Sequence, residues 1–247
     1  MDVQLWADIA KVSQMADVSF ILCGDFLQFP AICEFWAGSS VPEGSLECSH
    51  MIRDLADGNR LTLTENKRSD EVLFNFYTSL SSRPLAELLQ EARVLFPVTS
   101  RLADTTLVIS HARRRYLNCK RNLSEKPPSA VFLRAPITGS GTGPQSMFVW
   151  AGLRVVGSGG AVKKGVFEIV ASVTEDGDVT LSNGVRLTAH QAIRSLRLCW
   201  AITYAGCQGL TLEGVVRLDC TDSQHFTARH VYVGSSRATS HQLLEVV

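Results

Sequence analysis

Apolar positions near the start of the chain follow first a helical and then a strand-like pattern. From Asp2 to Ala16 they recur at helical spacing, which predicts an amphipathic helix. Ser19 to Cys23 is an apolar run that stops at Gly24-Asp25, as buried strands often do. We therefore expect the helix to pack on this strand.

The next segments predict a connection and then a second α/β region. Residues 33–58 are rich in Gly, Ser and Pro and contain one predicted helix near 48–55, and 60–64 reads as a short strand. Helical spacing returns in 70–80 and 84–93, the latter opened by Pro84. A buried strand at 105–109 precedes an arginine-rich helix at 111–122, an order that fits a parallel sheet.

A different pattern of short alternating runs fills 131–188. Asp176-Gly177 and Asn183-Gly184 are hairpin signals between such runs, which predicts a small antiparallel barrel or curled sheet. Apolar runs then return, and each predicts a strand of the parallel sheet: 198–203, 215–219, 231–233 and 243–247.

Composition limits the function classes. The chain has 247 residues, of which 45% are hydrophobic and 19% charged, enough for one large or two modest domains. Its formal net charge is zero, so any nucleic-acid contact must come from local clusters. The seven cysteines form no C-x-x-C pair, and we expect no metal site or disulfide framework.

The sequence also bears on location. It shows no secretory pattern and no apolar stretch approaching the roughly 18 residues of a membrane span. We expect an intracellular protein, in a nuclear, mitochondrial, viral or bacterial cytoplasmic setting.

Four ordered motifs carry a resemblance. They are Gly24-Asp25-x-x-Gln28-x-Pro30, Leu63-x-x-x-x-Arg68-Ser69, Thr203-x-x-x-x-Gln208-Gly209-Leu-Thr-Leu212, and Tyr232-Val-x-x-Ser236-Arg237-Ala-Thr239. In this order they resemble the C-terminal part of a superfamily 1 DNA helicase, a P-loop NTPase and ATP hydrolase. The branch is the RecD-like one, which includes the PIF-type and Helitron helicases.

The resemblance implies a fold and a domain organisation. The fold class is α/β, a RecA-like second motor lobe with an inserted small antiparallel β-barrel and a remnant of the first lobe. Residues 1–58 would be that remnant and a linker, 59–128 and 191–247 the two parts of the second lobe, and 129–190 the barrel.

The resemblance also implies roles in holding ATP. Arg68 and Arg237 match the γ-phosphate-sensing and arginine-finger residues, and planar guanidinium groups suit phosphate oxygens. Gln28 matches a glutamine that contacts the γ-phosphate or the attacking water. Asp25 matches a carboxylate beside the magnesium site, although a helix cap would explain it too. Gln208 and Gly209 match a motif facing nucleotide and DNA, which Thr203 opens.

One motif departs from the family. Ala205-Gly206 stands where members usually have His-Lys, so two side chains able to touch DNA or phosphate are absent. Contacts with single-stranded DNA, or with RNA, would come instead from the basic cluster of the 111–122 helix. Arg113, Arg114 and Asn118 are the candidates, and a solvated helix face explains the charges equally well.

Two parts of an ATP site are missing from the sequence. It contains no Gly-rich loop ending in Lys-Ser/Thr and no Asp-Glu pair for magnesium, and Gly139 to Pro144 lacks the lysine. We expect a truncated helicase whose ATP and Mg²⁺ are bound only if an N-terminal lobe is supplied, upstream or by a separate polypeptide. The chain alone should be nearly inactive. A non-catalytic nucleic-acid-binding or degenerate helicase-derived module is the alternative hypothesis.

Overall fold

The computed structural model describes residues 3–30, 35–36, 38–42, 44–80, 83–136 and 143–247. The chain divides into two compact units, Met1–Lys67 and Arg68–Val247. Each unit is described by itself.

The first unit holds two helices and one strand pair. Helix α1 (Val3–Met15) forms as predicted but buries none of its residues. Strands β1 (Phe35–Trp36) and β2 (Ser39–Ser40) pair antiparallel. Helix α2 (His50–Leu55) begins at Ser49, whose Oγ accepts a hydrogen bond from the Met51 amide at 3.1 Å.

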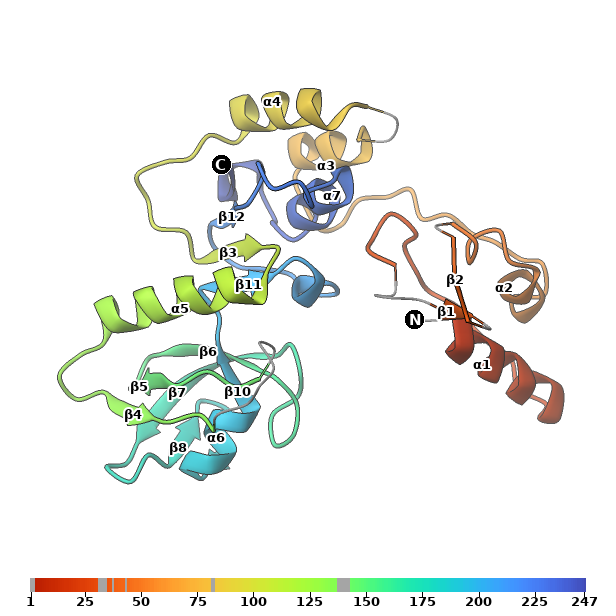
Figure 1. Ribbon diagram of the computed structural model, residues 1–247. Helices are drawn as coiled ribbons and strands as arrows, with labels where there is room; N and C mark the ends of the chain where they lie inside the picture. The colour runs from red at the N-terminus through yellow and green to blue at the C-terminus, as the bar shows by residue number, and fades with distance from the viewer. Residues whose placement is uncertain (1–2, 31–34, 37, 43, 81–82, 137–142) are drawn as a thin grey trace. The chain divides into compact units, whose positions relative to one another are not determined.

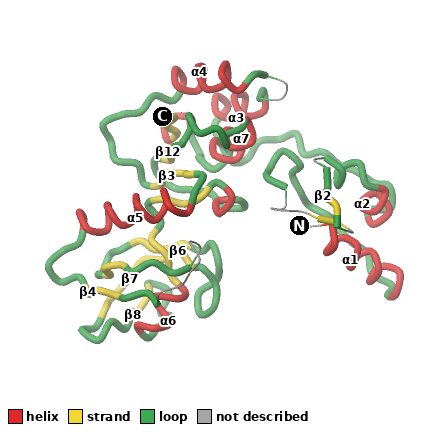
Figure 2. Tube along the Cα trace, in the orientation of Figure 1, coloured by secondary structure: helices red, strands yellow, loops and turns green. Residues whose placement is uncertain are grey.

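Two strands predicted in this unit do not form. Residues 19–23 and 60–64 are loop (Figure 2), and Ile21 and Leu61 are 94% and 93% exposed. Both predictions were wrong because a strand needs a neighbour for its backbone hydrogen bonds. Among the described residues neither segment pairs with one.

The second unit is built on a four-stranded parallel sheet in the order β11-β3-β12-β13. Its strands are β3 (Thr105–Val108), β11 (Ala201–Thr203), β12 (Val216–Leu218) and β13 (Leu244–Val246). Helix α5 (His111–Glu125) contacts β3 and β11, and α4 (Leu85–Leu95) contacts β13. Helix α3 (Glu71–Thr78) lies beside α7 (Ala228–Ser235), which contacts β12 (Figure 1).

The segment 231–233, predicted to be a strand, lies inside helix α7. Strands β12 and β13 are parallel neighbours, and such neighbours cannot be joined by a hairpin. The chain between them must cross over the sheet, and α7 is the α-helix within that crossover. The β-branched Val-Tyr-Val pattern is overridden by this need and by the Thr227–His230 capping box.

An antiparallel insertion separates α5 from β11. Strands β6 (Arg154–Gly157), β7 (Phe167–Val173), β8 (Val179–Leu181), β9 (Arg186–Leu187) and β10 (Leu196–Leu198) form one sheet in the order β10-β6-β7-β8-β9. Strands β4 (Val131–Leu133) and β5 (Met147–Val149) form a separate pair. Helix α6 (Ala189–Ser195) precedes β10, and one apolar core joins these elements.

The two hairpin signals are confirmed. Gly177 and Gly184 have φ of +88° and +86°, and the β7–β8 and β8–β9 pairs turn at these positions. The predicted strand 198–203 is instead two strands, β10 and β11, in different sheets. The chain leaves the insertion for the parallel sheet at Cys199-Trp200.

Among the described residues, no helix combines the length and apolar character needed to cross a membrane.

Candidate functional site

Arg237 lies just beyond the end of α7 and is the largest fully buried side chain, at 1% exposed. It follows a helix, not a strand as predicted. Its Nε donates to the Val233 carbonyl at 3.1 Å, its Nη1 to the Leu210 carbonyl at 3.1 Å, and its Nη2 to Ser236 Oγ at 2.8 Å. The backbone carbonyl of Arg237 also accepts from the Leu212 amide at 3.0 Å. Arg237 thus fastens the Gln208 loop (residues 204–212) to the end of α7.

Arg68 reaches the same place from the other end of the unit. Its Nη1 donates to the Ser236 carbonyl at 3.3 Å, across 168 positions of sequence. Arg68 is exposed, whereas Arg237 is buried. The two arginines that the sequence singles out therefore meet at Ser236, Arg68 at its backbone carbonyl and Arg237 at its side-chain hydroxyl.

The Gln208 loop begins at the carboxyl end of β11. The hydroxyl of the buried Thr203 accepts a hydrogen bond from the Gly206 amide at 3.1 Å. A Cβ on Gly206 would lie 2.8 Å from that hydroxyl oxygen, so the turn leaves little room for a side chain there. Gly209 has φ of +78°, and Gln208 is half-buried beside it. Ala205-Gly206, which replaces the His-Lys pair usual in the resembling family, therefore lies in a tight turn.

The basic helix α5 divides its polar residues between surface and interior. Arg113 pairs with Asp219, its Nε and Nη2 lying 3.0 Å and 2.9 Å from Oδ2. Asn118 is buried; its Nδ2 donates to the Ala201 carbonyl at 2.9 Å, and its Oδ1 accepts from the Ala201 amide at 2.8 Å. Asn118 therefore holds the start of β11 against α5.

Arg114 lies between Arg113 and Asn118 in sequence, and two of its donor atoms, unlike theirs, have no acceptor in the described part of the chain. Its Nε and Nη2 are buried without a hydrogen-bond acceptor among the described residues. The pKa of Arg114 is lowered, first by burial and then by the charge of Arg115.

Asp25 and Gln28 are brought together in the first unit. Asp25 Oδ1 accepts from the Leu27 amide at 2.9 Å and Oδ2 from Gln28 Nε2 at 3.1 Å. Asp25 thus organises a local turn after a loop, where the sequence predicted the end of a strand.

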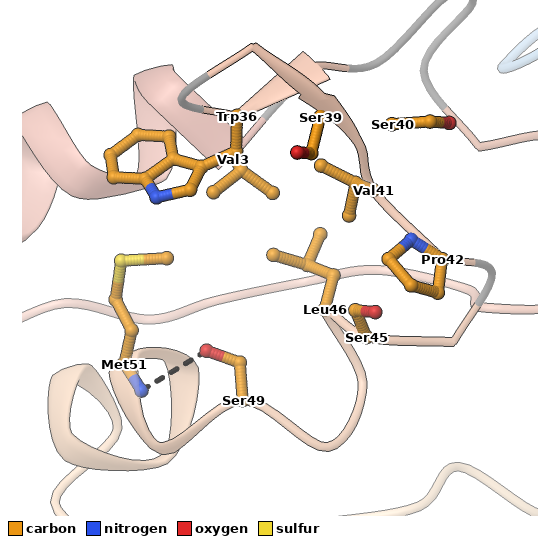
Figure 3. Close-up of a pocket in the computed structure, with 10 residues that line it drawn as sticks. All are labelled: Val3, Trp36, Ser39, Ser40, Val41, Pro42, Ser45, Leu46, Ser49 and Met51. Carbon is orange, nitrogen blue, oxygen red and sulfur yellow. Dashed lines mark hydrogen bonds between the residues drawn. The ribbon is translucent and has the colours of Figure 1, made fainter.

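A cavity in the first unit has space of about 340 Å³ for water-sized atoms (Figure 3). Its walls are apolar side chains and serines, among them Trp36, Leu46 and Met51, with no charged group. In the described part of the chain, no group of three or more His, Cys, Asp or Glu residues is placed to hold a metal ion.

Sequence reasoning overlooked three groups at these sites. Ser236, the Leu210 carbonyl and Asp219 each accept bonds from a predicted arginine. A backbone carbonyl has no sequence signal, but Ser236 stands next to Arg237 inside the motif, and that position could have identified it.

Comparison with solved structures finds Pif1 helicases. The chain superposes on Pif1 from Candida albicans with a TM-score of 0.61 at 18% identity, covering 91% of this chain and 62% of that one. It matches Bacteroides Pif1 bound to single-stranded DNA with a TM-score of 0.52 at 16% identity, covering 75% and 51%. A Bacteroides Pif1 complex with ADP-AlF3 and single-stranded DNA gives the same values.

The fold is that of a RecA-like helicase lobe. The four-stranded parallel sheet of the second unit matches such a lobe, and the likeness to the Candida albicans structure covers 91% of the chain. The chain spans less than two thirds of the length of these Pif1 proteins. No protein-family model and no curated protein matches the sequence.

Proposed function

We propose that this chain is the second-lobe part of an ATP-dependent DNA helicase that moves 5′ to 3′. Its fold is shared with Pif1 helicases, and its four motifs occur in the order of that family. The direction of movement rests on analogy with the RecD-like branch, through the antiparallel insertion.

One observation carries the proposal: Arg68, Arg237 and the Gln208 loop converge at the end of α7. Three motifs distant in sequence would have no reason to meet in an unrelated fold. A guanidinium group offers paired N–H donors in the geometry that phosphate oxygens prefer. We assign the γ-phosphate contact to the exposed Arg68 and, on closure of the site, to Arg237, whose present bonds also anchor the Gln208 loop.

The remaining nucleotide contacts need groups that the 247 residues lack. A phosphate loop and a pair of magnesium carboxylates must come from a first lobe, to which Asp25 and Gln28 would belong. ATP, when bound, supplies the free energy for movement. This chain's residues would bind and orient its terminal phosphate.

Single-stranded DNA is the proposed track. A Pif1 of the same fold is described as bound to single-stranded DNA. In this chain Thr203 and Arg113 follow the carboxyl ends of β11 and β3, neighbouring strands of one sheet edge. Asn118, being buried, would serve by positioning α5.

The test has two arms. The 247-residue chain is titrated with fluorescein-labelled oligo(dT) at several salt concentrations, and we expect binding that weakens steeply with salt. DNA-stimulated ATP hydrolysis is then measured on the polypeptide that joins this chain to a phosphate loop. We expect Arg68→Ala to lower it by about 10³-fold or more. Arg186→Ala, an exposed arginine of β9, is the control and should change nothing.

Either of two results would contradict the proposal. One is unchanged ATP hydrolysis in Arg68→Ala. The other is a reading frame that contains no G-x-x-G-x-G-K-[ST] run followed by Asp-Glu.

A non-catalytic nucleic-acid-binding module is the second candidate. It is favoured by the bonds of Arg237 to the Val233 and Leu210 carbonyls and to Ser236 Oγ, which would hold the fold together without any nucleotide. Salt-dependent oligo(dT) binding in a polypeptide that never hydrolyses ATP would support this candidate.

A further inference from the structure

A small cavity lies in the second unit between α5, the start of β5 and strand β10. Its lining residues are Arg114, Asn118, Gln145, Met147, Arg197 and Leu198. It leaves about 10 Å³ for the centres of water-sized atoms, which is room for one such atom. Arg114 and Arg197 are only partly buried, so the cavity adjoins the surface.

The cavity has donors in excess. Arg114 Nε and Nη2 lie buried with no acceptor in the described part of the chain. Asn118 Oδ1 accepts from the Ala201 amide at 2.8 Å and makes no hydrogen bond to these two Arg114 atoms. Gln145 turns its Nε2 to the Arg115 carbonyl at 2.8 Å. None of the described lining residues is acidic.

The second arginine adds charge of the same sign. Arg197 Nη1 donates to the Arg194 carbonyl at 3.0 Å and the Leu196 carbonyl at 2.7 Å, near the end of α6. Burial lowers the pKa of Arg197, and the charge of Arg114 lowers it further. His111 and Arg115 also face Arg114 electrostatically. Two like charges in a shared, partly dry site are costly unless an anion lies between them.

We propose that the cavity is an anion site that receives one oxygen of a phosphate group. A water molecule could accept from Arg114 but would leave both charges uncompensated. A phosphate oxygen both accepts hydrogen bonds and carries the charge. The volume admits one oxygen, and the rest of the group would stay at the surface.

Phosphate can come from two sources, inorganic phosphate or a nucleic-acid backbone. Binding of a nucleic-acid phosphate rests on the proposed function, in which Arg113 of the same helix contacts single-stranded DNA. Binding of inorganic phosphate does not depend on the proposed function.

Thermal unfolding of the full chain in a phosphate titration tests the site. We expect a saturable rise in melting temperature at millimolar phosphate, of about 3–5 °C at ten times the dissociation constant. Arg114→Met should lose this rise and should melt higher than the wild type without phosphate, because it removes a buried, unpaired charge. Arg115→Met has the same charge change one position away and should keep the response.

Two outcomes would overturn the proposal. They are a rise that grows linearly with phosphate in wild type and Arg114→Met alike, and an equal saturable rise with chloride. The first is the general salting effect of phosphate. If Arg114→Met does not fold, Arg114→Lys serves in its place, because the Lys ammonium is a compact point charge without the planar fork of guanidinium donors, and the phosphate affinity should fall at least tenfold. An unchanged affinity in Arg114→Lys would equally overturn the site.

The nucleic-acid source is tested by competition. If the backbone uses the site, phosphate should displace labelled oligo(dT) from the wild type and not from Arg114→Met. A saturable phosphate response in a chain that binds no oligo(dT) would support the anion site as a site for free phosphate and contradict the proposed helicase function.

Discussion

Buried polar side chains in the second unit act by holding loops. Arg237 donates to the Leu210 carbonyl in the Gln208 loop, and Asn118 donates to the Ala201 carbonyl at the start of β11. Such bonds are needed because an unpaired buried carbonyl costs about 1–3 kcal/mol. The exposed Arg68 and Arg113 lie at the surface instead, where partners can be exchanged. Arg237 and Asn118 therefore hold the fold by their present bonds, whereas Arg68 and Arg113 are already at the surface.

His230 is another polar side chain of the second unit whose burial affects the fold, and it can be titrated. It is half-buried on α7, stacked on Phe226 at 5.2 Å, and its Nδ1 accepts from the Thr227 amide at 3.1 Å. Burial lowers its pKa from 6.5 to about 4. Between pH 4 and pH 6.5, His230 is therefore mostly protonated in the unfolded chain and mostly neutral in the folded chain.

We therefore expect His230 to stabilise the fold fully above about pH 6.5 and to lose this effect as the pH falls toward 4. The loss should be about 1–2 kcal/mol by pH 5, after allowance for partial exposure. Urea unfolding at pH 7 and pH 5 measures it. His230→Gln keeps the capping box and should flatten this dependence, whereas the exposed His190→Gln should not. Identical pH profiles for wild type and His230→Gln would refute the expectation.

At the scale of elements, α7 is the piece that joins the chemistry to the sheet. It crosses from β12 to β13, and its C-terminal end presents Ser236 and Arg237 to the Gln208 loop. Its close approach to the sheet depends on Gly234. A Cβ there would lie 2.5 Å from Leu218 Cδ2 and 3.0 Å from Tyr204 Cε1.

Gly234→Ala should destabilise the protein even though alanine favours helix. The propensity gain is about 1 kcal/mol, while overpacking against a buried Leu218 costs about 1–3 kcal/mol. We expect a net loss of about 1 kcal/mol, measured by urea unfolding, and a displaced Arg237. Gly24→Ala is the control, since nothing lies within 4 Å of its added Cβ. A stabilised Gly234→Ala would show that the helix can move away at no cost.

At the scale of the whole molecule, the apolar core is unevenly distributed. Among the described residues, every buried apolar side chain except Leu55 belongs to the second unit. The start of that unit is tied to its end, because the Asp70 amide donates to the Thr239 carbonyl at 3.2 Å and Asp70 Oδ2 accepts from the His241 amide at 2.7 Å. The second unit therefore contains what it needs to fold.

The fragment 68–247 should fold alone. We expect its main thermal transition, followed by circular dichroism, to lie within about 2 °C of that of the full chain. A fragment starting at Leu85 lacks α3 with its buried Leu73 and Phe76, and it should melt well below both. If 68–247 melts as low as that shorter fragment, the first unit contributes to the core of the second.

The sequence by itself determined the features that depend on near neighbours. Periodicity predicted α1, α3, α4 and α5, and Asn183-Gly184 predicted a hairpin, since the turn residues and helical spacing act within a few positions. Motif order also predicted that Arg68 and Arg237 belong to one site, and the structure brings both to Ser236.

Only the tertiary structure decided what depends on distant partners. The strands predicted at 19–23 and 60–64 have no neighbouring strand in the described chain, and 231–233 became helix because two parallel strands need a crossover between them. The burial of Arg237 and the unpaired donors of Arg114 follow from packing between segments far apart in sequence. A local pattern sets which structure a segment prefers, but hydrogen-bond partners and burial are supplied from elsewhere in the chain.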